Sequence, residues 1–380
     1  MPKGLSGDET RRLVASVDTL VDLQASQLEQ VKPPVLGTGK DANLKGVQSQ
    51  LSQSHFVPKR TINSEDLAAS AELLLPSIWA SRKRKLRGEP LNFRPKVITE
   101  RNLNRVRPFL EQPLNDDAKT KGYRKARQIG LSENCVTEAL WFADTRKHTK
   151  VFYTFPTNKQ MQDFSNTRIA EAIAESTYLQ SIIGDVKNVN LKKVGSSFLF
   201  LRGAQAEHLG EGVDADIAFF DEIDRMPPKV KAAFEESLSG SIHGWVREIS
   251  TPTVPNHGID EGWSRSRQYH WFIKCSHCGT RQTLEWLPTD DFSGRVSQVQ
   301  MDGLWVYACR HCGKELPETD RMSGEWVSKF GRREASYYQF NQLMAPWLSA
   351  QKLYDKQENY PFKQLFLLFL VVFIPFWHSP

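Results

Sequence analysis

Short apolar runs alternate with amphipathic stretches between about Lys121 and Thr253. Runs rich in β-branched and aromatic residues predict strands at Val151–Phe155, Ser197–Arg202, Ile217–Phe220 and Val246–Ser250. Helical periodicity predicts helices at Glu133–Phe142, Lys159–Glu175 and Lys229–Leu238. Strands that alternate with helices favour βαβ units, so we expect an α/β fold with a parallel sheet.

The pattern divides the chain into five segments. Residues 1–60 are polar and predict a helical arm and linker, and residues 61–118 form an entry segment with a helix at Ser64–Trp79. Leu67, Leu73 and Leu74 mark the apolar side of that helix. The core covers residues 119–262, a segment with paired cysteines covers 263–322, and a C-terminal segment covers 323–380.

The C-terminal segment contains the apolar run Leu365–Trp377. This run is shorter than the roughly twenty residues that span a bilayer. A core segment cut off by truncation, translation in a shifted frame and a tail anchor are three interpretations. We favour a truncated or frame-shifted end and expect no membrane partner.

The composition is that of an ordinary globular protein, with 39% hydrophobic residues, 25% charged residues and a net charge of +6. Basic residues concentrate between Arg82 and Arg107, where only Glu89 and Glu100 oppose them. Such a stretch either contacts a phosphate backbone or forms a solvated face. The N-terminus lacks an apolar signal segment, and five cysteines do not suit a secreted disulfide scaffold, so we expect a reducing cytoplasm.

The strand Ile217–Phe220 ends in two carboxylates, Asp221 and Glu222. A continuous apolar run is typical of a buried parallel strand, and ligand-binding groups gather at the carboxyl ends of such strands. There Asp221 can hold a metal-bound phosphate, and Glu222 can polarise the attacking water. The alternative is an acidic pair that opens a turn together with Asp224.

A phosphate-binding loop should precede that strand. The segment Lys125–Ser132 matches the pattern G-x-x-x-x-G-K-[ST] only at Gly130 and Ser132. Gly130 lets the backbone curl around a phosphate, Ser132 offers a hydroxyl to Mg²⁺, and the helix that begins near Leu131 presents free N–H groups. Because Leu131 replaces the lysine of the pattern, the positive charge has to come from the front of the loop. An ordinary loop before a helix is the alternative.

Small hydroxyl residues follow another predicted strand, in the segment Ser250-Thr251-Pro252-Thr253. Hydroxyls at the end of a strand can sense a γ-phosphate, although turns use the same residues routinely. The segment is therefore informative only in combination with the other motifs.

Two cysteine pairs lie in the segment 263–322: Cys275 with Cys278, and Cys309 with Cys312, each pair followed by glycine. This is zinc-ribbon spacing, in which two knuckles place four thiolates tetrahedrally around one ion. The pairs are further apart than the about 15–20 residues usual for such a site, which leaves room for a small β-subdomain. With four sulfur ligands the zinc would be structural, and Cys135 is expected to pack in the core.

Together these segments resemble the large terminase subunit of tailed phages, specifically the lambda-like GpA family. The resemblance covers Ser64 to Asn359 and rests on the order and spacing of several motifs: Ile78-Trp79-Ala80, Lys125–Ser132, Phe155-Pro156-Thr157, Asp221-Glu222-Ile223-Asp224, Ser250–Thr253 and the paired cysteines. In this family the basic residue of the loop is often shifted toward the loop's start, which suits Lys125 or Arg127.

The resemblance implies a P-loop NTPase-type parallel sheet flanked by helices, with a small zinc-ribbon-like β insertion. It implies an ATP-hydrolysing motor that packages double-stranded DNA in the host cytoplasm, as a homo-oligomer on the portal of a prohead and with a small terminase subunit. ATP, Mg²⁺ and structural Zn²⁺ are the implied cofactors. The implied site residues are Asp221 and Glu222 for catalysis, Asp221 and Ser132 for Mg²⁺, Lys125, Arg127, Gln128, Gly130, Leu131 and Ser132 for ATP, and Ser250, Thr251 and Thr253 for coupling.

Other functions stay open. A zinc-containing DNA-binding protein with a degenerate, non-hydrolysing ATPase fold, an inactive prophage remnant, fits the leucine at position 131. A helicase-like translocase would need a second motor lobe, and no second βαβ array is predicted after Met322. The family also carries a nuclease domain, which no residue of this sequence supports. The polar strand before the loop, Lys119–Arg124, leaves its own placement open.

Overall fold

The computed structural model describes residues 64–94, 106–184, 188–204, 214–286 and 295–359. The chain divides into two compact units, Met1–Ser70 and Ala71–Pro380, and the first contributes only the beginning of helix α2 to the described residues. The predicted arm at residues 1–60 and the apolar run Leu365–Trp377 lie outside the described residues. Within the described part of the chain, no helix is long and apolar enough to cross a membrane.

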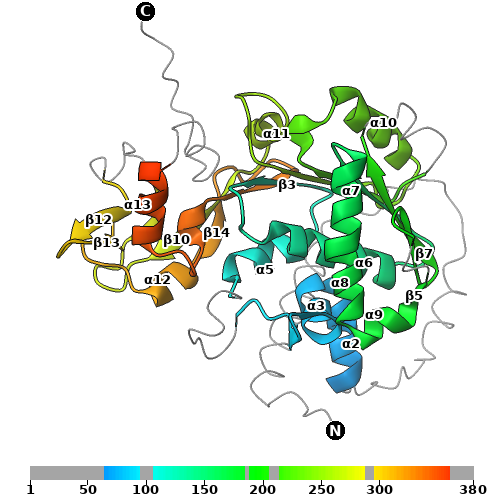
Figure 1. Cartoon of the computed structure of the whole chain (residues 1–380), viewed down its shortest axis with the longest axis horizontal. Coiled ribbons are helices and arrows are strands. Elements are labelled where there is room, and N and C mark those ends of the chain that lie inside the picture. Colours follow the sequence, from blue (N-terminus) through cyan, green and yellow to red (C-terminus); the bar gives the residue numbers. More distant parts are fainter. Residues whose placement is uncertain (1–63, 95–105, 185–187, 205–213, 287–294, 360–380) are drawn as a thin grey trace, which may run out of the picture. The chain divides into compact units, whose positions relative to one another are not determined.

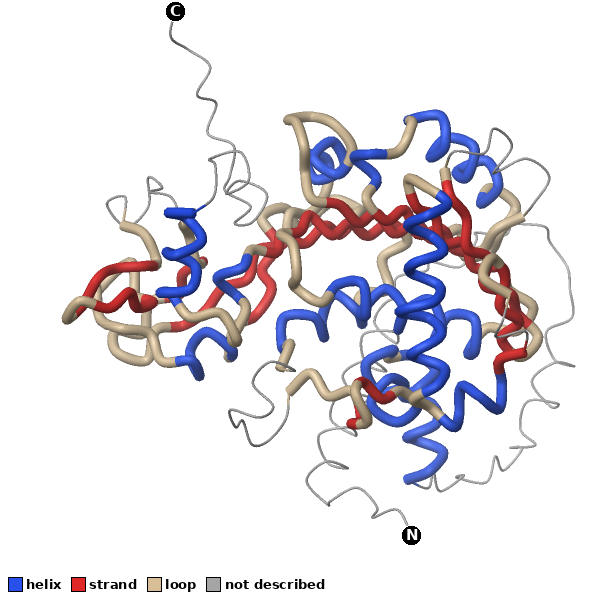
Figure 2. Tube along the Cα trace, viewed as in Figure 1, coloured by secondary structure: helices blue, strands red, loops and turns tan. Residues whose placement is uncertain are grey.

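One large sheet organises the second unit. Its strands lie in the order β11-β10-β15-β3-β9-β8-β4-β7-β6-β5, with β14 paired to β10. Neighbours from β10 to β7 are parallel, whereas β5, β6, β11 and β14 pair antiparallel at the edges. Figure 2 shows these strands as a continuous band with helices on both sides. The strands are β3 (Thr120–Lys125), β4 (Lys150–Phe155), β5 (Ile183–Gly184), β6 (Leu191–Val194), β7 (Ser197–Gly203), β8 (Ile217–Asp221), β9 (Trp245–Ser250), β10 (Tyr269–Lys274), β11 (Arg281–Thr283), β14 (Glu325–Ser328) and β15 (Ser336–Phe340).

Helices cover both faces of this sheet: α5 and α6 lie on one face, and α10 and α11 lie on the other (Figure 1). Because side chains alternate along a strand, neighbouring residues of β8 enter different cores. Phe219 packs on the α6 side, whereas Phe220 packs against Phe234 of α10. The helices are α2 (Ser64–Leu74), α3 (Pro76–Lys83), α5 (Pro108–Asn115), α6 (Leu131–Thr145), α7 (Asn158–Phe164), η1 (Ser165–Ile169), α8 (Ala170–Ala174), α9 (Thr177–Ile182), η2 (Ile223–Arg225), α10 (Pro228–Leu238), α11 (Ile259–Arg265), α12 (Glu318–Met322), η4 (Gln342–Met344) and α13 (Ala350–Asn359).

Two small antiparallel sheets complete the described structure, β1 (Lys85–Leu86) with β2 (Glu89–Pro90) and β12 (Gln298–Met301) with β13 (Leu304–Tyr307). The mixed α/β fold with a largely parallel sheet flanked by helices is therefore confirmed. Each of the four predicted strands is observed to within one residue at either end.

The helix predictions need two corrections. The predicted helix Ser64–Trp79 is two helices, α2 and α3, because Pro76 lacks an N–H and begins a new helix after the extended residue Leu75. Leu73 and Leu74 are 54% and 60% exposed, so they do not form a buried side of α2. The predicted helix Lys159–Glu175 is observed as α7 and α8 joined by the π-helical turn η1.

The polar strand before the loop is β3, and it lies in the interior of the sheet between β15 and β9. Its polar side chains are compensated: Lys121 pairs with Glu138 of α6 at 2.9 Å, and Arg124 pairs with Asp260 of α11 at 3.0 Å. The sheet also includes β10 and β15, which come from the segments 263–322 and 323–380. Strands on both sides of the cysteine-bearing segment thus join the sheet that contains β3.

Candidate active site

The loop between β3 and α6 has the backbone shape that a phosphate site needs. Gly130 is the N-cap of α6 with a φ of 93°, and Gln128 has a φ of 61°, so the chain curls before the helix begins. The N–H groups of the first turn of α6 have no partner within the helix. Leu131 is only 2% exposed and packs in the core, so it can offer a ligand nothing but its backbone. Lys125 and Ser132 are half-buried, and Arg127 is exposed.

Asp221 ends β8 and is the electrostatic neighbour of the loop. Its buried carboxylate accepts a hydrogen bond from the hydroxyl of Tyr153 on β4 at 3.1 Å. Burial raises the pKa of Asp221, and the positive charge of Lys125 acts in the opposite direction. A cation and an acid from two strand ends therefore face one site. Together with the hydroxyl of Ser132, Asp221 supplies the oxygen donors that Mg²⁺ prefers.

Glu222 occupies a strained position at the start of the turn after β8. Its φ of 59° and ψ of 46° lie in the left-handed region, which costs a non-glycine residue about 1–3 kcal/mol and is found most often at functional sites. Its carboxylate accepts hydrogen bonds from Nε2 of Gln160 at 2.9 Å and from Arg225 at 3.2 Å. The acid is thus held in one orientation and remains partly open to water.

Gln160 is a site residue that the sequence analysis missed. It lies on α7, and the hydroxyl of Thr157, the N-cap of that helix, accepts a hydrogen bond from the Gln160 backbone N–H at 3.2 Å. The spacing Thr157-x-x-Gln160 is that of a capping box, so a signal was present in the sequence. The segment after β4 thereby fixes the position of Glu222.

Asp224 ties the predicted coupling segment to the turn that contains Glu222. Its carboxylate accepts hydrogen bonds from the N–H and the hydroxyl of Thr253, at 2.7 and 3.0 Å, and from the N–H of Ile259 at 2.9 Å. Its own N–H donates to the hydroxyl of Ser250 at 3.3 Å. The structure therefore brings Ser250 and Thr253 against the turn after β8, while no hydrogen bond of the Thr251 hydroxyl is found among the described residues.

Part of the basic stretch is used inside the protein. Arg84 is 2% exposed and donates to Glu133, in the first turn of α6, at 3.0 Å. Arg94 pairs with Glu111 at 2.6 Å, and Arg82 pairs with Glu72 at 2.8 Å. Arg84 is therefore a structural contact to the helix after the loop, and a phosphate backbone cannot reach it. Lys85 and Arg87 are exposed.

The four paired cysteines come together. The Sγ atoms of Cys278 and Cys309 are 3.7 Å apart, those of Cys275 and Cys312 are 4.0 Å apart, and all four lie within 4.8 Å of one another. A tetrahedron with Zn–S bonds of about 2.3 Å has edges of about 3.8 Å, so the sulfur positions fit a zinc ion. The glycine after each pair has a φ of 74° or 75° and closes its knuckle with an N–H bond of 2.8 Å to the first cysteine's carbonyl oxygen.

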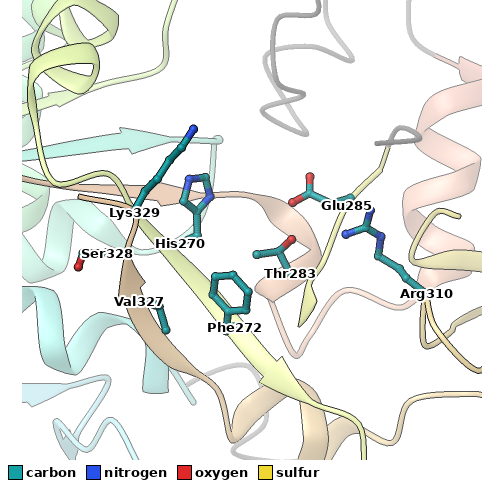
Figure 3. Close-up of a pocket in the computed structure, with 8 residues that line it drawn as sticks. All are labelled: His270, Phe272, Thr283, Glu285, Arg310, Val327, Ser328 and Lys329. Atoms are coloured by element: carbon teal, nitrogen blue, oxygen red, sulfur yellow. The ribbon is translucent and has the colours of Figure 1, made fainter. Parts of the chain in front are cut away.

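A separate cavity of about 320 Å³ lies where β10, β11 and β14 meet (Figure 3). Burial lowers the pKa of His270, which lines this cavity, to about 4, and the charges of Lys329 and Arg124 act in the same direction. The lining residues are His270, Phe272, Thr283, Glu285, Arg310, Val327, Ser328 and Lys329. None of them belongs to the loop or to the turn after β8, so this cavity is distinct from the candidate active site.

Comparison with known proteins follows the same motifs. The family described as phage terminase large subunit gpA, ATPase domain, matches residues 104–326, a segment that contains the loop, Asp221, Glu222, the coupling segment and the four cysteines. The curated proteins include no significant match.

Several solved structures are similar to this chain. The large terminase ATPase domain of Thermus phage P74-26 is 14% identical over 71% of this chain and 96% of that chain, with a TM-score of 0.45. The large terminase of bacteriophage HK97 is 13% identical over 50% of this chain and 39% of that chain, with a TM-score of 0.41. The large terminase of another thermophilic bacteriophage, in complex with ATP-gamma-S, is 11% identical over 67% of this chain and 48% of that chain, with a TM-score of 0.37.

Proposed function

The chain belongs to the family of phage terminase large subunits of the gpA type, and on this premise we propose that it hydrolyses ATP to drive double-stranded DNA into a prohead. Family membership supports an ATPase that serves as a motor subunit in phage DNA packaging. Our proposal adds the movement of the DNA itself, a homo-oligomer on the portal, a small terminase subunit as partner and the host cytoplasm as location. Among the described residues we assign none to DNA cleavage.

The observation that carries the proposal is the arrangement of Lys125, Asp221 and Glu222 around the loop. Lys125 and the free N–H groups of α6 would bind the triphosphate, with Arg127 at the exposed rim. Asp221 and Ser132 would hold Mg²⁺, which neutralises the phosphate charge when it is bound.

Glu222 would orient and polarise the attacking water. A carboxylate can do this only if it stays ionised and points at one place, and the hydrogen bonds from Gln160 and Arg225 supply both conditions. The left-handed backbone of Glu222 aims its side chain away from β8, toward α7. Gln160 would therefore act as a positioning residue for the catalytic acid.

Asp224 supports a coupling role for Ser250, Thr251 and Thr253. It lies two residues after Glu222 and bonds to the backbone and the side chain of Thr253. A change in the turn after β8 during hydrolysis would therefore pull on the segment that leads to α11. We propose that this connection transmits the hydrolytic step to the part of the protein that moves DNA.

A structural zinc ion and a revised DNA contact complete the proposal. Zinc bound by the four thiolates would hold the two knuckles together at the end of β10, which enters the main sheet through its pairing with β15. For DNA contact we propose Lys85 and Arg87, because they are exposed, and not Arg84, which pairs with Glu133.

The test of hydrolysis uses the purified chain with Mg²⁺ and ATP. Wild-type protein should release phosphate, and Asp221→Asn should lose most of that activity, since its side chain can no longer hold the metal with a charge. Glu236→Gln, an exposed acid on α10, is the matched control. If wild-type protein binds no ATP at millimolar concentration, the zinc-containing DNA-binding protein with a degenerate ATPase fold becomes the better account.

The test of DNA contact measures the salt dependence of binding to a duplex. Replacing Lys85 and Arg87 with glutamine should reduce the slope of log K against log[salt] by about one to two. Arg84→Gln serves as the buried comparison and should leave the slope unchanged while it lowers stability. An unchanged slope in the Lys85/Arg87 variant would remove these residues from the DNA path.

A further inference from the structure

Arg107 is a largely buried cation beside the phosphate-binding loop. It precedes α5, and its guanidinium carbon lies 3.5 Å from the centroid of the Trp347 ring. Its Nε lies 3.0 Å from the point that a Cβ on Gly130 would occupy, so it touches the N-cap of α6. The stacking on Trp347 and the contact with Gly130 together fix the plane of the guanidinium group.

Within the described residues, no carboxylate pairs with Arg107. Its one recorded hydrogen bond runs from NH1 to the carbonyl oxygen of Val106 at 3.1 Å. Other buried arginines are compensated: Arg124 pairs with Asp260 at 3.0 Å, and Arg247 pairs with Glu138 at 2.7 Å. A buried charge without a partner is costly, so a protein keeps one mainly where a ligand supplies the counter-charge.

The surroundings of Arg107 are positive as well. Burial lowers its pKa to about 10, and the nearest charge that acts on it is the cation Arg87. Gly130 places Arg107 against the first turn of α6, where the helix dipole and the free N–H groups add further positive potential. Two positive features in contact repel each other unless an anion lies next to both.

We propose that Arg107 binds the phosphate chain of the nucleotide together with the first turn of α6, with Trp347 as the platform that holds its guanidinium in place. This inference rests on the proposed function of the loop as a nucleotide site. A guanidinium offers a planar fork of N–H donors that matches phosphate oxygens, which a lysine does not. Arg107 would then supply part of the positive charge that the leucine at position 131 cannot.

The matched control for this inference lies at the other end of α6. Arg146, the C-cap residue, also stacks on aromatic rings, with its guanidinium carbon 4.3 Å from the Trp141 centroid, and burial lowers its pKa to about 10 as well. It is remote from the loop along a helix of 15 residues. Arg146→Gln therefore removes a comparable stacked cation without touching the nucleotide site.

The experiment measures binding of Mg²⁺–ATP and of inorganic tripolyphosphate to folded protein by calorimetry. Arg107→Gln should weaken both ligands by about ten- to a hundredfold, the loss of charge-assisted hydrogen bonds. Arg107→Lys should recover only part of that loss, and Arg146→Gln should bind both ligands as wild type does. Melting temperatures confirm that each variant is folded, and Arg107→Lys alone decides the matter if the glutamine variant is not.

Each other result overturns the inference in a recognisable way. If wild type binds ATP and Arg107→Gln binds it equally well, Arg107 is structural and the proposed function stands. If Arg107→Gln weakens ATP but not tripolyphosphate, the residue contacts the base or sugar, and the phosphate assignment is wrong. If wild type binds neither ligand, the proposed function fails and this inference fails with it.

Discussion

Glu138→Gln is predicted to destabilise the protein strongly, because Glu138 is the shared counter-ion of two buried cations. Its Oε1 accepts from Nζ of Lys121 on β3 at 2.9 Å and from Nε of Arg247 on β9 at 2.7 Å. Lys121 and Arg247 are both 0% exposed, and Glu138 is 1% exposed. One carboxylate on α6 therefore connects the strand before the phosphate loop with the strand before the coupling segment.

The magnitude follows from what the substitution leaves behind. Glutamine keeps the shape of the side chain but removes the charge, so two cations stay buried without a counter-ion. Removal of one partner of a buried ion pair typically costs about 3–5 kcal/mol in the free energy of unfolding. Arg247 cannot lose its proton, but Lys121 can, since burial already lowers its pKa and Glu138 is the largest influence that raises it.

The sign of the pH dependence follows from Lys121. In the variant, the folded state excludes a proton that the unfolded lysine binds below its ordinary pKa of 10.5. Stability of the variant therefore rises with pH toward that value, and the difference from wild type shrinks. Urea unfolding at several pH values measures this difference, with the exposed Glu236→Gln as control. A loss below about 1 kcal/mol at neutral pH, or a difference that does not change with pH, would refute the reasoning.

Three further predictions concern the metal, a histidine and a glycine. Purified protein should contain about one equivalent of zinc, which the double variant Cys275→Ser/Cys278→Ser loses; metal retained in that variant excludes a four-thiolate site. The pKa of His270 falls from 6.5 to about 4 mainly through burial, so the unfolded state binds a proton that the folded state excludes. Wild type should therefore lose stability as pH falls through that window, and the melting temperature of His270→Gln should fall less over the same range. A Cβ on Gly258 would lie 2.5 Å from Oδ1 of Asp224, and its φ is 55°, so Gly258→Ala should cost roughly 1–3 kcal/mol and slow hydrolysis. Unchanged phosphate release in a destabilised Gly258→Ala protein would argue against coupling through Asp224.

The strands around the site could be predicted because their burial leaves a local trace. Residues of β4, β7, β8 and β9 are apolar in runs, and a parallel strand buried on both faces has that composition. Asp221 and Glu222 could be found for the same reason, since they interrupt such a run at the strand's end. The N-cap position of Gly130 and the start of α6 at Leu131 were likewise readable from the loop pattern.

The rest depends on partners far away in the chain. The polar residues of β3 belong in the interior only because Lys121 meets Glu138 and Arg124 meets Asp260, and no local pattern announces these pairs. The strand β15 was not predicted, because its place beside β3 is set by pairing between Ser336–Phe340 and Lys121–Lys125. Arg84 belongs to a basic run by sequence, but its burial follows from contact with α6.

The measurement that tests the central claim most directly is the turnover of Glu222→Gln at saturating Mg²⁺ and ATP, with binding measured in parallel. Glutamine keeps the size of the side chain and its contact with Gln160 but can no longer take part as a carboxylate. We predict wild-type affinity for ATP together with a fall in turnover of at least about a hundredfold. Turnover equal to wild type at equal affinity would contradict the assignment of Glu222 as the catalytic acid of a packaging ATPase.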